Sequence, residues 1–141
     1  MSVRFVTPEE VEAAFYRAFQ ELDQTLMTQV WSDDPETVCV HPGGDLLRGN
    51  SSVIQSWIEV FSGARCPTLV YRALQETADG TLAVHLVEEM IRPGGQQNAE
   101  ASRVLATNVY RRGRDGWRML VHHASVPVVR SRRGDSVGRL H

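Results

Sequence analysis

The spacing of apolar residues changes once along this chain, and that change limits which folds the chain can adopt. Between residues 8 and 61, apolar side chains recur three and four positions apart, as in helices that bury one face. From residue 68 to residue 127 they alternate with polar side chains, as in strands with one buried face. Helices followed by consecutive strands predict an α+β domain with the helices packed on one face of an antiparallel sheet.

Three helices are expected in the first half of the chain. Thr7 is a suitable N-cap for the first helix, and Pro8 follows it at the first helical position. Asp23 is the expected cap of a short second helix, which Pro35 follows closely. Asn50 or Ser51 is the expected cap of the third.

Five strands are expected, and the last four are long enough to build a sheet. Their ranges are 37–41, 68–77, 81–92, 100–112 and 116–127. The Asp79-Gly80 dipeptide predicts a tight hairpin turn between the second and third of these strands. The four long strands therefore predict an antiparallel meander, formed by a single domain over residues 1–127.

The basic residues exclude several kinds of chemistry, because all 15 are arginine. Without lysine there is no Schiff-base chemistry and no phosphate-binding P-loop. The formal net charge of −2 argues against nucleic acid as a partner. Residues 128–141 carry four arginines against one acidic residue, so we expect a loose, arginine-rich C-terminal tail there.

The two cysteines and the lack of long apolar runs indicate where the chain works. Cys39 and Cys66 have no CxxC spacing, so they are expected to be free thiols in a reducing compartment. No segment is apolar enough to be a signal peptide or to span a membrane. We therefore expect a soluble cytoplasmic protein. Cys39 and His41 share a strand face, and an inert buried thiol is favoured there over a thiolate–imidazole pair.

The last strand contains two adjacent histidines that are expected to point to opposite faces of the sheet. His122 and His123 therefore do not ligate one metal ion, and we expect neither a metal site nor a cofactor. His123 alternates in phase with Trp117 and Met119, so it is expected to face the helices. There it is either a proton-transfer group or a buried histidine held by one hydrogen bond.

Three further residues are candidates on the long strands. Glu88 lies in phase with Leu86 and Met90, so it is expected on the buried face as a base with a raised pKa. The alternative is that Glu88 pairs with an arginine. Asn108 and Tyr110 share one strand face and are expected to offer hydrogen bonds to a ligand. The alternative for Asn108 is that it holds a neighbouring loop.

The remaining candidates lie in the first half of the chain. His41 ends the first strand beside the small-residue turn 42–44, a common place for a functional group. Arg48 is the candidate cation for an anionic ligand. Trp31 and Trp57 are in phase with apolar stripes, and are expected as pocket walls or as core residues.

Several segments resemble the SnoaL-like branch of the nuclear transport factor 2-like superfamily. They are residues 14–19 (AFYRAF), 31–35 (WSDDP), 40–44 (VHPGG), 47–49 (LRG), 106–110 (ATNVY) and 115–125 (DGWRMLVHHAS). The resemblance implies a cone, in which a curved antiparallel sheet wraps around the N-terminal helices and a pocket opens at one end. It also implies a homodimer formed through the outer face of the sheet, to which Leu120 and Ala124 are expected to contribute.

Two functions are compatible with this resemblance. The first is a small-molecule pocket that binds, or transforms by acid–base chemistry, an apolar carbonyl-bearing metabolite. Its catalytic residues are expected to be His123, Glu88 and His41. The pocket residues are expected to be Trp31, Arg48, Trp57, Asn108 and Tyr110. The alternative is a non-catalytic, dimeric association module with a filled cone. A cavity lined by His41 and His123 favours the first function, and a core filled by tryptophan and phenylalanine favours the second.

Overall fold

The computed structural model describes residues 3–96 and 98–128, so the expected C-terminal tail lies outside the described residues except for Val128. The elements in chain order are α1 (Pro8–Glu21), α2 (Gln24–Val30), β1 (Val38–Val40), β2 (Leu47–Arg48), α3 (Asn50–Phe61), β3 (Thr68–Ala78), β4 (Leu82–Arg92), β5 (Ser102–Gly113) and β6 (Gly116–Ser125). The predicted order of helices followed by long strands is confirmed, and β2 is an additional short strand. Within the described residues, no helix has the length and hydrophobicity needed to cross a membrane.

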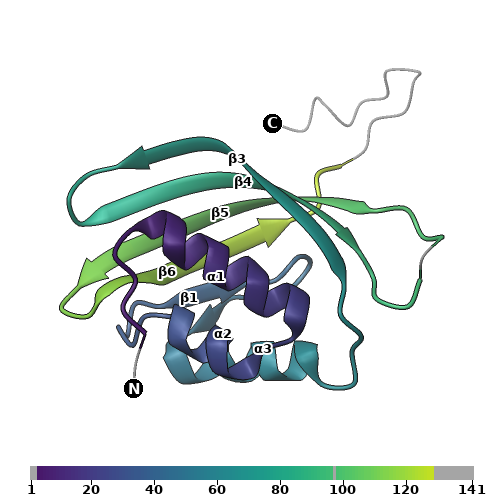
Figure 1. Cartoon of the computed structure of the whole chain (residues 1–141), viewed down its shortest axis with the longest axis horizontal. Helices are drawn as coiled ribbons and strands as arrows, with labels where there is room; N and C mark the ends of the chain where they lie inside the picture. The colour runs from purple at the N-terminus through teal and green to yellow at the C-terminus, as the bar shows by residue number, and fades with distance from the viewer. Residues whose placement is uncertain (1–2, 97, 129–141) are drawn as a thin grey trace.

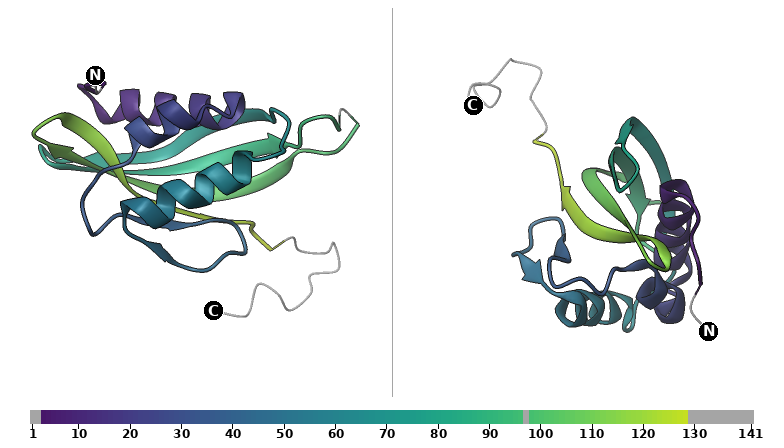
Figure 2. Two further views of the ribbon diagram at one scale, coloured as in Figure 1. Left: turned by 90° about the horizontal axis from the view of Figure 1, so that it is seen from below. Right: turned by 90° about the vertical axis from the view of Figure 1, so that its left-hand side faces the viewer.

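The strands form one six-stranded sheet in the order β2-β1-β6-β5-β4-β3. The four long strands pair antiparallel, as predicted. β1 pairs in parallel with β6, placing Val38 opposite Val121 and Val40 opposite His123. The sheet bends into an arc and the helices lie on its concave side (Figures 1 and 2). The fold is therefore the α+β cone that the sequence predicted.

Two of the three predicted helix caps are confirmed. Thr7 Oγ1 accepts a 3.2 Å hydrogen bond from the Glu10 amide, and Asp23 Oδ1 accepts a 3.0 Å bond from the Leu26 amide. The prediction for α3 was wrong, because its N-cap is Gly49, which has φ 86° and no side chain to cap with. Asn50 instead donates from Nδ2 to the Ser32 carbonyl at 2.7 Å, which ties the start of α3 to the end of α2.

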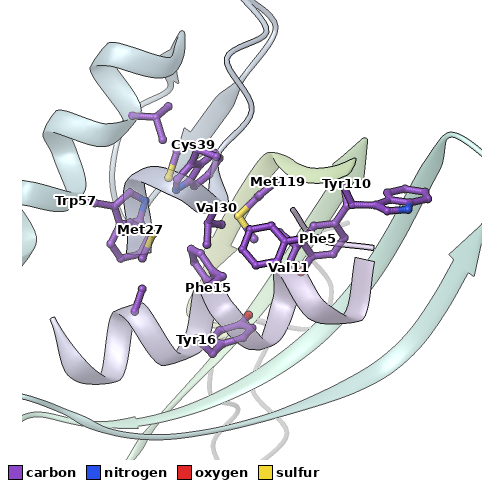
Figure 3. Close-up of a cluster of buried hydrophobic side chains, with 14 of the residues drawn as sticks. Phe5, Val11, Phe15, Tyr16, Met27, Val30, Cys39, Trp57, Tyr110 and Met119 are labelled. Atoms are coloured by element: carbon purple, nitrogen blue, oxygen red, sulfur yellow. The ribbon is translucent and has the colours of Figure 1, made fainter. Parts of the chain in front are cut away.

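Aromatic side chains fill the concave side of the sheet around Phe15 (Figure 3). The Phe15 ring meets the rings of Tyr16, Trp57 and Trp31 edge to face, at centroid distances of 4.8, 5.3 and 6.3 Å. Phe15 and Tyr16 are completely buried. Edge-to-face contacts at these distances are favourable beyond the burial of apolar area. The interior of the cone is therefore a packed aromatic core.

A β-bulge in β6 reverses the faces of the second half of this strand. Val109 pairs with Val121, but the next residue, Tyr110, pairs with Met119, so Leu120 is an extra residue. After the bulge, His122 is buried and His123 is exposed. The prediction that His123 faces the helices was therefore wrong.

The same bulge changes the expected dimer surface. Leu120 and Ala124 are only 7 % and 2 % exposed, so neither offers apolar surface to a partner. The expectation that these two residues supply apolar character to the outer face was wrong. The residues that do so belong to other strands and are described below.

The two faces of β4 are also opposite to the prediction. His85 and Glu89 are each 1 % exposed, whereas Leu86 is 39 % exposed. The polar residues are buried because each finds a hydrogen-bond partner on α1. Glu88 lies on the outer face with Leu86, so the expectation of a desolvated base at this position was wrong.

Candidate functional site

Four buried polar residues form a continuous hydrogen-bonded chain across the core. Tyr16, on α1, donates to Glu89 Oε2 of β4 at 2.6 Å, and Asn108 Nδ2 of β5 donates to the Tyr16 hydroxyl at 2.9 Å. His122 Nδ1, on β6, lies 2.6 Å from Asn108 Oδ1. Because Asn108 Nδ2 is a donor, its Oδ1 is the acceptor, and the proton lies on His122 Nδ1. The chain therefore runs in one direction, from His122 to Glu89.

Burial displaces the pKa values along this chain. Loss of solvation raises the pKa of Glu89 to about 7, although the hydrogen bond from Tyr16 acts in the opposite direction. Burial also raises the pKa of Tyr16. Burial lowers the pKa of His122 to about 3, and the nearby His41 and His123 add to this effect. At neutral pH, His122 is therefore uncharged, and Glu89 is near its midpoint of ionisation.

A second buried cluster lies beside the first, where the start of α1 meets β4 and β5. His85 Nδ1 is 2.6 Å from Glu12 Oε2, and the Tyr110 hydroxyl donates to the same oxygen at 2.7 Å. Burial, together with the charge of Glu12, raises the pKa of Tyr110 well above its ordinary value. Asn108 and Tyr110 are buried, and their polar groups are bonded to other protein side chains.

His41 lies at the edge of the aromatic core, just after β1. Its Nε2 is 2.9 Å from Ser56 Oγ, and its ring is 4.7 Å from the Trp57 ring. Burial lowers the pKa of His41. Cys39 Sγ is 3.8 Å from the same ring nitrogen, but burial raises the pKa of this thiol to about 12. Cys39 is therefore protonated at neutral pH, in agreement with the expected inert thiol.

The two tryptophans and Arg48 lie in different environments. Trp31 and Trp57 are 3 % and 2 % exposed, and neither indole Nε1 has a hydrogen-bond partner among the described residues. Both are therefore core residues. Arg48 is exposed on β2, opposite Val38. The structure does not bring Arg48 to either buried cluster.

Glu88 is held by two arginines on the outer face of the sheet. Arg103 Nε donates to Glu88 Oε2 at 2.7 Å, and Arg72 Nη2 donates to Oε1 at 3.2 Å. The hydrogen bond from Arg103 is the main cause that lowers the pKa of Glu88. The structure therefore confirms the alternative in which Glu88 pairs with an arginine. The expectation that the pKa of Glu88 is raised was wrong.

Three pockets lie outside the aromatic core. A groove of about 300 Å³ on the outer sheet face is lined by Leu74, Leu86, Val87, Leu105, Ala106, Thr107, His123 and Ser125. A polar pocket of about 530 Å³ contains Trp31 and Arg111, and one of about 390 Å³ contains Phe19 and Leu22. None of these three pockets is lined by His41, so none is the cavity expected between His41 and His123.

Several buried polar residues were difficult to predict from the sequence. Glu12 and Tyr16 lie on the apolar face of α1, where a polar residue reads as an interruption of the stripe. His85 and Glu89 are four positions apart and so share one face of β4. This spacing was the one indication that both side chains are buried. The larger number of apolar residues on the opposite face of β4 predicted the reverse.

Comparison with known proteins places this geometry in a family. A putative calcium/calmodulin-dependent protein kinase type II association domain from Thiobacillus denitrificans is 36 % identical, has a TM-score of 0.83, and is matched over 90 % of this chain and all of its own. A putative dehydratase of the NTF2-like family from Streptomyces avermitilis is 27 % identical with a TM-score of 0.77, over 86 % of this chain and 94 % of its own.

One curated relative and one family model complete the comparison. The F-box protein SKIP8 of Arabidopsis thaliana is 26 % identical over 124 residues, or 84 % of this chain. The chain spans about half of that protein, since the match covers 49 % of its length. The model of the SnoaL-like domain matches residues 9–129. Because this match includes nearly all of the helices and strands described above, the chain belongs to the SnoaL-like family of the NTF2-like superfamily.

Proposed function

We propose that this chain is an association module whose outer sheet face binds a second copy of itself. We define the outer sheet face by six residues of β3 to β6, which are Leu74, Val84, Leu86, Leu105, Thr107 and His123. Leu74, Leu86 and Val84 are 47 %, 39 % and 37 % exposed. Apolar side chains gathered on one exposed surface are typical of a protein–protein contact. This apolar surface is the observation that carries the proposal.

The charges around the outer sheet face have the arrangement of an interface rim. Glu88 is paired with Arg72 and Arg103, so the polar groups beside the apolar residues are already satisfied within one chain. A satisfied polar rim around an apolar centre allows a partner to remove water without leaving charges unpaired. The groove beside Leu86 and His123 provides a recess for a partner side chain.

The filled core supports association over ligand binding. Phe15, Trp31 and Trp57 occupy the concave side of the sheet, where the family resemblance implied a pocket. The similar protein from Thiobacillus denitrificans is named as an association domain, and this chain matches its entire length. Both observations favour a function performed by the outer surface.

The proposal is tested with Leu86→Glu, which places a charge at the centre of the outer sheet face. Sedimentation velocity is expected to show a dimer for the wild-type protein and a monomer for this variant. The matched control is Val60→Glu on α3, since Val60 is similarly exposed at 42 % but lies away from this face. Circular dichroism checks that both variants are folded. A Leu86→Glu variant that stays dimeric contradicts the proposed surface.

A second function is favoured by the chain of hydrogen bonds from His122 to Glu89. We propose that this hydrogen-bonded chain performs acid–base chemistry on an apolar, carbonyl-bearing small molecule. Glu89 would act as the base, because its pKa of about 7 suits proton transfer at neutral pH. Tyr16 would orient this carboxylate, because its hydroxyl donates to Glu89 Oε2. The similar protein from Streptomyces avermitilis, named as a putative dehydratase, is the comparison that supports this candidate.

Native mass spectrometry of gently purified protein tests the second function. A co-purified small molecule is expected in the wild-type protein and is expected to be lost in Glu89→Gln. Glu59→Gln, on the exposed side of α3, is the control that changes the same chemical group elsewhere. If no small molecule is found, or if Glu89→Gln retains it, the second function is rejected while the association proposal is unaffected.

A further inference from the structure

We infer that Glu9, Glu76 and His85 bind a divalent transition-metal cation, with Glu12 as the carboxylate that orients His85. The inference does not depend on either proposed function. One oxygen of Glu9, one oxygen of Glu76 and one nitrogen of His85 lie within 4.8 Å of one another. The cluster lies where the first turn of α1 meets the β3–β4 pair.

The backbone brings these residues together from two elements. Glu9 and Glu12 are three positions apart on α1, so their side chains lie on one face of the helix. Glu76 and His85 are paired directly across β3 and β4. The helix thus supplies two carboxylates. The sheet supplies the imidazole and the third carboxylate.

The orientation of His85 leaves one ring nitrogen facing a carboxylate. The Glu12 carboxylate accepts from the Tyr110 hydroxyl and from His85 Nδ1, at 2.7 and 2.6 Å, so the proton of His85 lies on Nδ1. His85 Nε2 lies 3.5 Å from Glu9 Oε2, and Nδ1 also lies 3.9 Å from Glu76 Oε2. Two exposed carboxylates therefore flank the buried imidazole in addition to Glu12.

The arrangement of Glu12 and His85 is common around metal ions. A histidine that ligates a metal typically donates its other ring N–H to a carboxylate, which fixes the ring orientation. Here, that carboxylate is Glu12, which is 5 % exposed, and Tyr110 holds it in turn. The buried imidazole is therefore fixed before any ion arrives, with Nε2 directed toward Glu9.

The charges of the cluster also favour a cation. Three carboxylates, those of Glu9, Glu12 and Glu76, lie within 4.0 Å of one imidazole. Within the described residues, no arginine nitrogen lies within 4.0 Å of these three carboxylates, and the chain has no lysine. A divalent ion supplies two positive charges and bridges the donor atoms directly.

The donor set fits an ion such as Zn²⁺ or Mn²⁺. These ions accept a mixture of imidazole nitrogen and carboxylate oxygen, whereas Mg²⁺ prefers oxygen donors alone. Glu9 and Glu76 have side chains that are 59 % and 48 % exposed, so both can rotate toward an ion that His85 holds. Water can complete the coordination from the exposed side.

The test measures ion binding directly, and the substitutions avoid the buried histidine. Purified protein carrying Cys66→Ser, which removes the exposed thiol as a competing ligand, is dialysed against Zn²⁺, and bound metal is counted by mass spectrometry. One high-affinity ion per chain is expected. Adding Glu9→Gln and Glu76→Gln to this background is expected to weaken binding by ~10–100-fold or more. Adding Glu59→Gln instead is expected to leave the affinity unchanged.

Thermal unfolding provides a second measurement in the same proteins. Zn²⁺ is expected to raise the Tm of the Cys66→Ser protein and not that of the Glu9→Gln/Glu76→Gln protein, because only a folded-state ligand stabilises. Mn²⁺ is expected to act in the same way, and Mg²⁺ to have little effect. Equal affinity for Zn²⁺ in the Cys66→Ser protein and the Glu9→Gln/Glu76→Gln protein overturns the inference. Absence of a high-affinity ion from the Cys66→Ser protein also overturns it.

Discussion

Tyr16 and Glu89 are joined by a 2.6 Å hydrogen bond in the core, although 73 residues separate them in the sequence. This bond ties α1 to the middle of the sheet. It also places a carboxyl group among aromatic residues, where burial raises the pKa of Glu89 to about 7. The stability of the fold and its capacity for proton transfer therefore depend on the same pair of side chains.

Removing the Tyr16 hydroxyl is expected to destabilise the protein. In Tyr16→Phe, Glu89 loses its donor and Asn108 Nδ2 loses its acceptor, so two buried polar groups are left unpaired. Leaving buried polar groups without a partner costs about 1–3 kcal/mol for each group. Urea-induced unfolding measures this loss as a lower midpoint.

Tyr71→Phe is the matched control for this substitution. The Tyr71 ring stacks on the Tyr16 ring at 4.2 Å, but within the described residues its hydroxyl has no hydrogen-bond partner. We expect a change of less than about 0.5 kcal/mol, as for a surface substitution. Equal midpoints for the two variants would show that the bond from Tyr16 to Glu89 contributes nothing to stability.

Acid is expected to destabilise the fold through His122. The pKa of His122 is lowered to about 3 in the folded state, from an ordinary value of 6.5. Between these two pH values the unfolded chain binds a proton that the folded chain does not, so stability falls as the pH falls. The loss amounts to about 2 kcal/mol between pH 6.5 and pH 4.5, because the unfolded histidine is only half protonated at pH 6.5.

The variant His122→Gln isolates this effect. Glu89 and His41 are present in both proteins, so their titrations cancel in the difference between wild type and variant. The stability of the wild-type protein relative to His122→Gln is expected to decrease steadily from pH 6.5 to pH 4.5, as measured by urea unfolding at each pH. A difference that does not change with pH would mean that His122 is protonated in the folded protein.

The sequence predicted those features that depend on neighbouring residues. Thr7 and Asp23 cap helices as expected, because a cap depends only on a side chain and an amide two or three positions away. The Asp79 carboxylate likewise accepts from the amides of Thr81 and Leu82 at the predicted hairpin. The curvature of the sheet was expected from the family resemblance alone.

The errors arose where the outcome depends on distant partners. The alternation rule places His123 inward, but the extra residue at Leu120 reverses it, and no local pattern indicates that bulge. On β4 the apolar residues lie outside, because Glu12 and Tyr16 of α1 satisfy His85 and Glu89 inside. The two positions on β4 were decided by α1, 73 residues away from each in the sequence.

Shortening Phe15 is expected to turn the filled core into a cavity. Phe15 contacts Tyr16, Trp57 and His122, with ring centroids 4.8, 5.3 and 4.8 Å away. Substitution by alanine is expected to cost about 3–5 kcal/mol in unfolding free energy. The new space is apolar and is therefore expected to bind xenon or benzene.

Phe19→Ala provides the comparison for the cavity. Phe19 is half-buried at the edge of the core and lines a pocket that is already open. We expect a smaller loss of stability and no new ligand binding for this variant. Binding of benzene by the wild-type protein, before any substitution, would instead show that the cone already contains an open cavity.

The mass of the wild-type protein in solution tests the central claim of association most directly. The chain has a mass of 15.8 kDa, and the exposed apolar residues of the outer sheet face are expected to be covered by a second copy. Sedimentation equilibrium at micromolar concentration is predicted to give about twice the mass of one chain, falling to a single chain in Leu86→Glu. A wild-type protein with the mass of one chain at these concentrations would contradict the account.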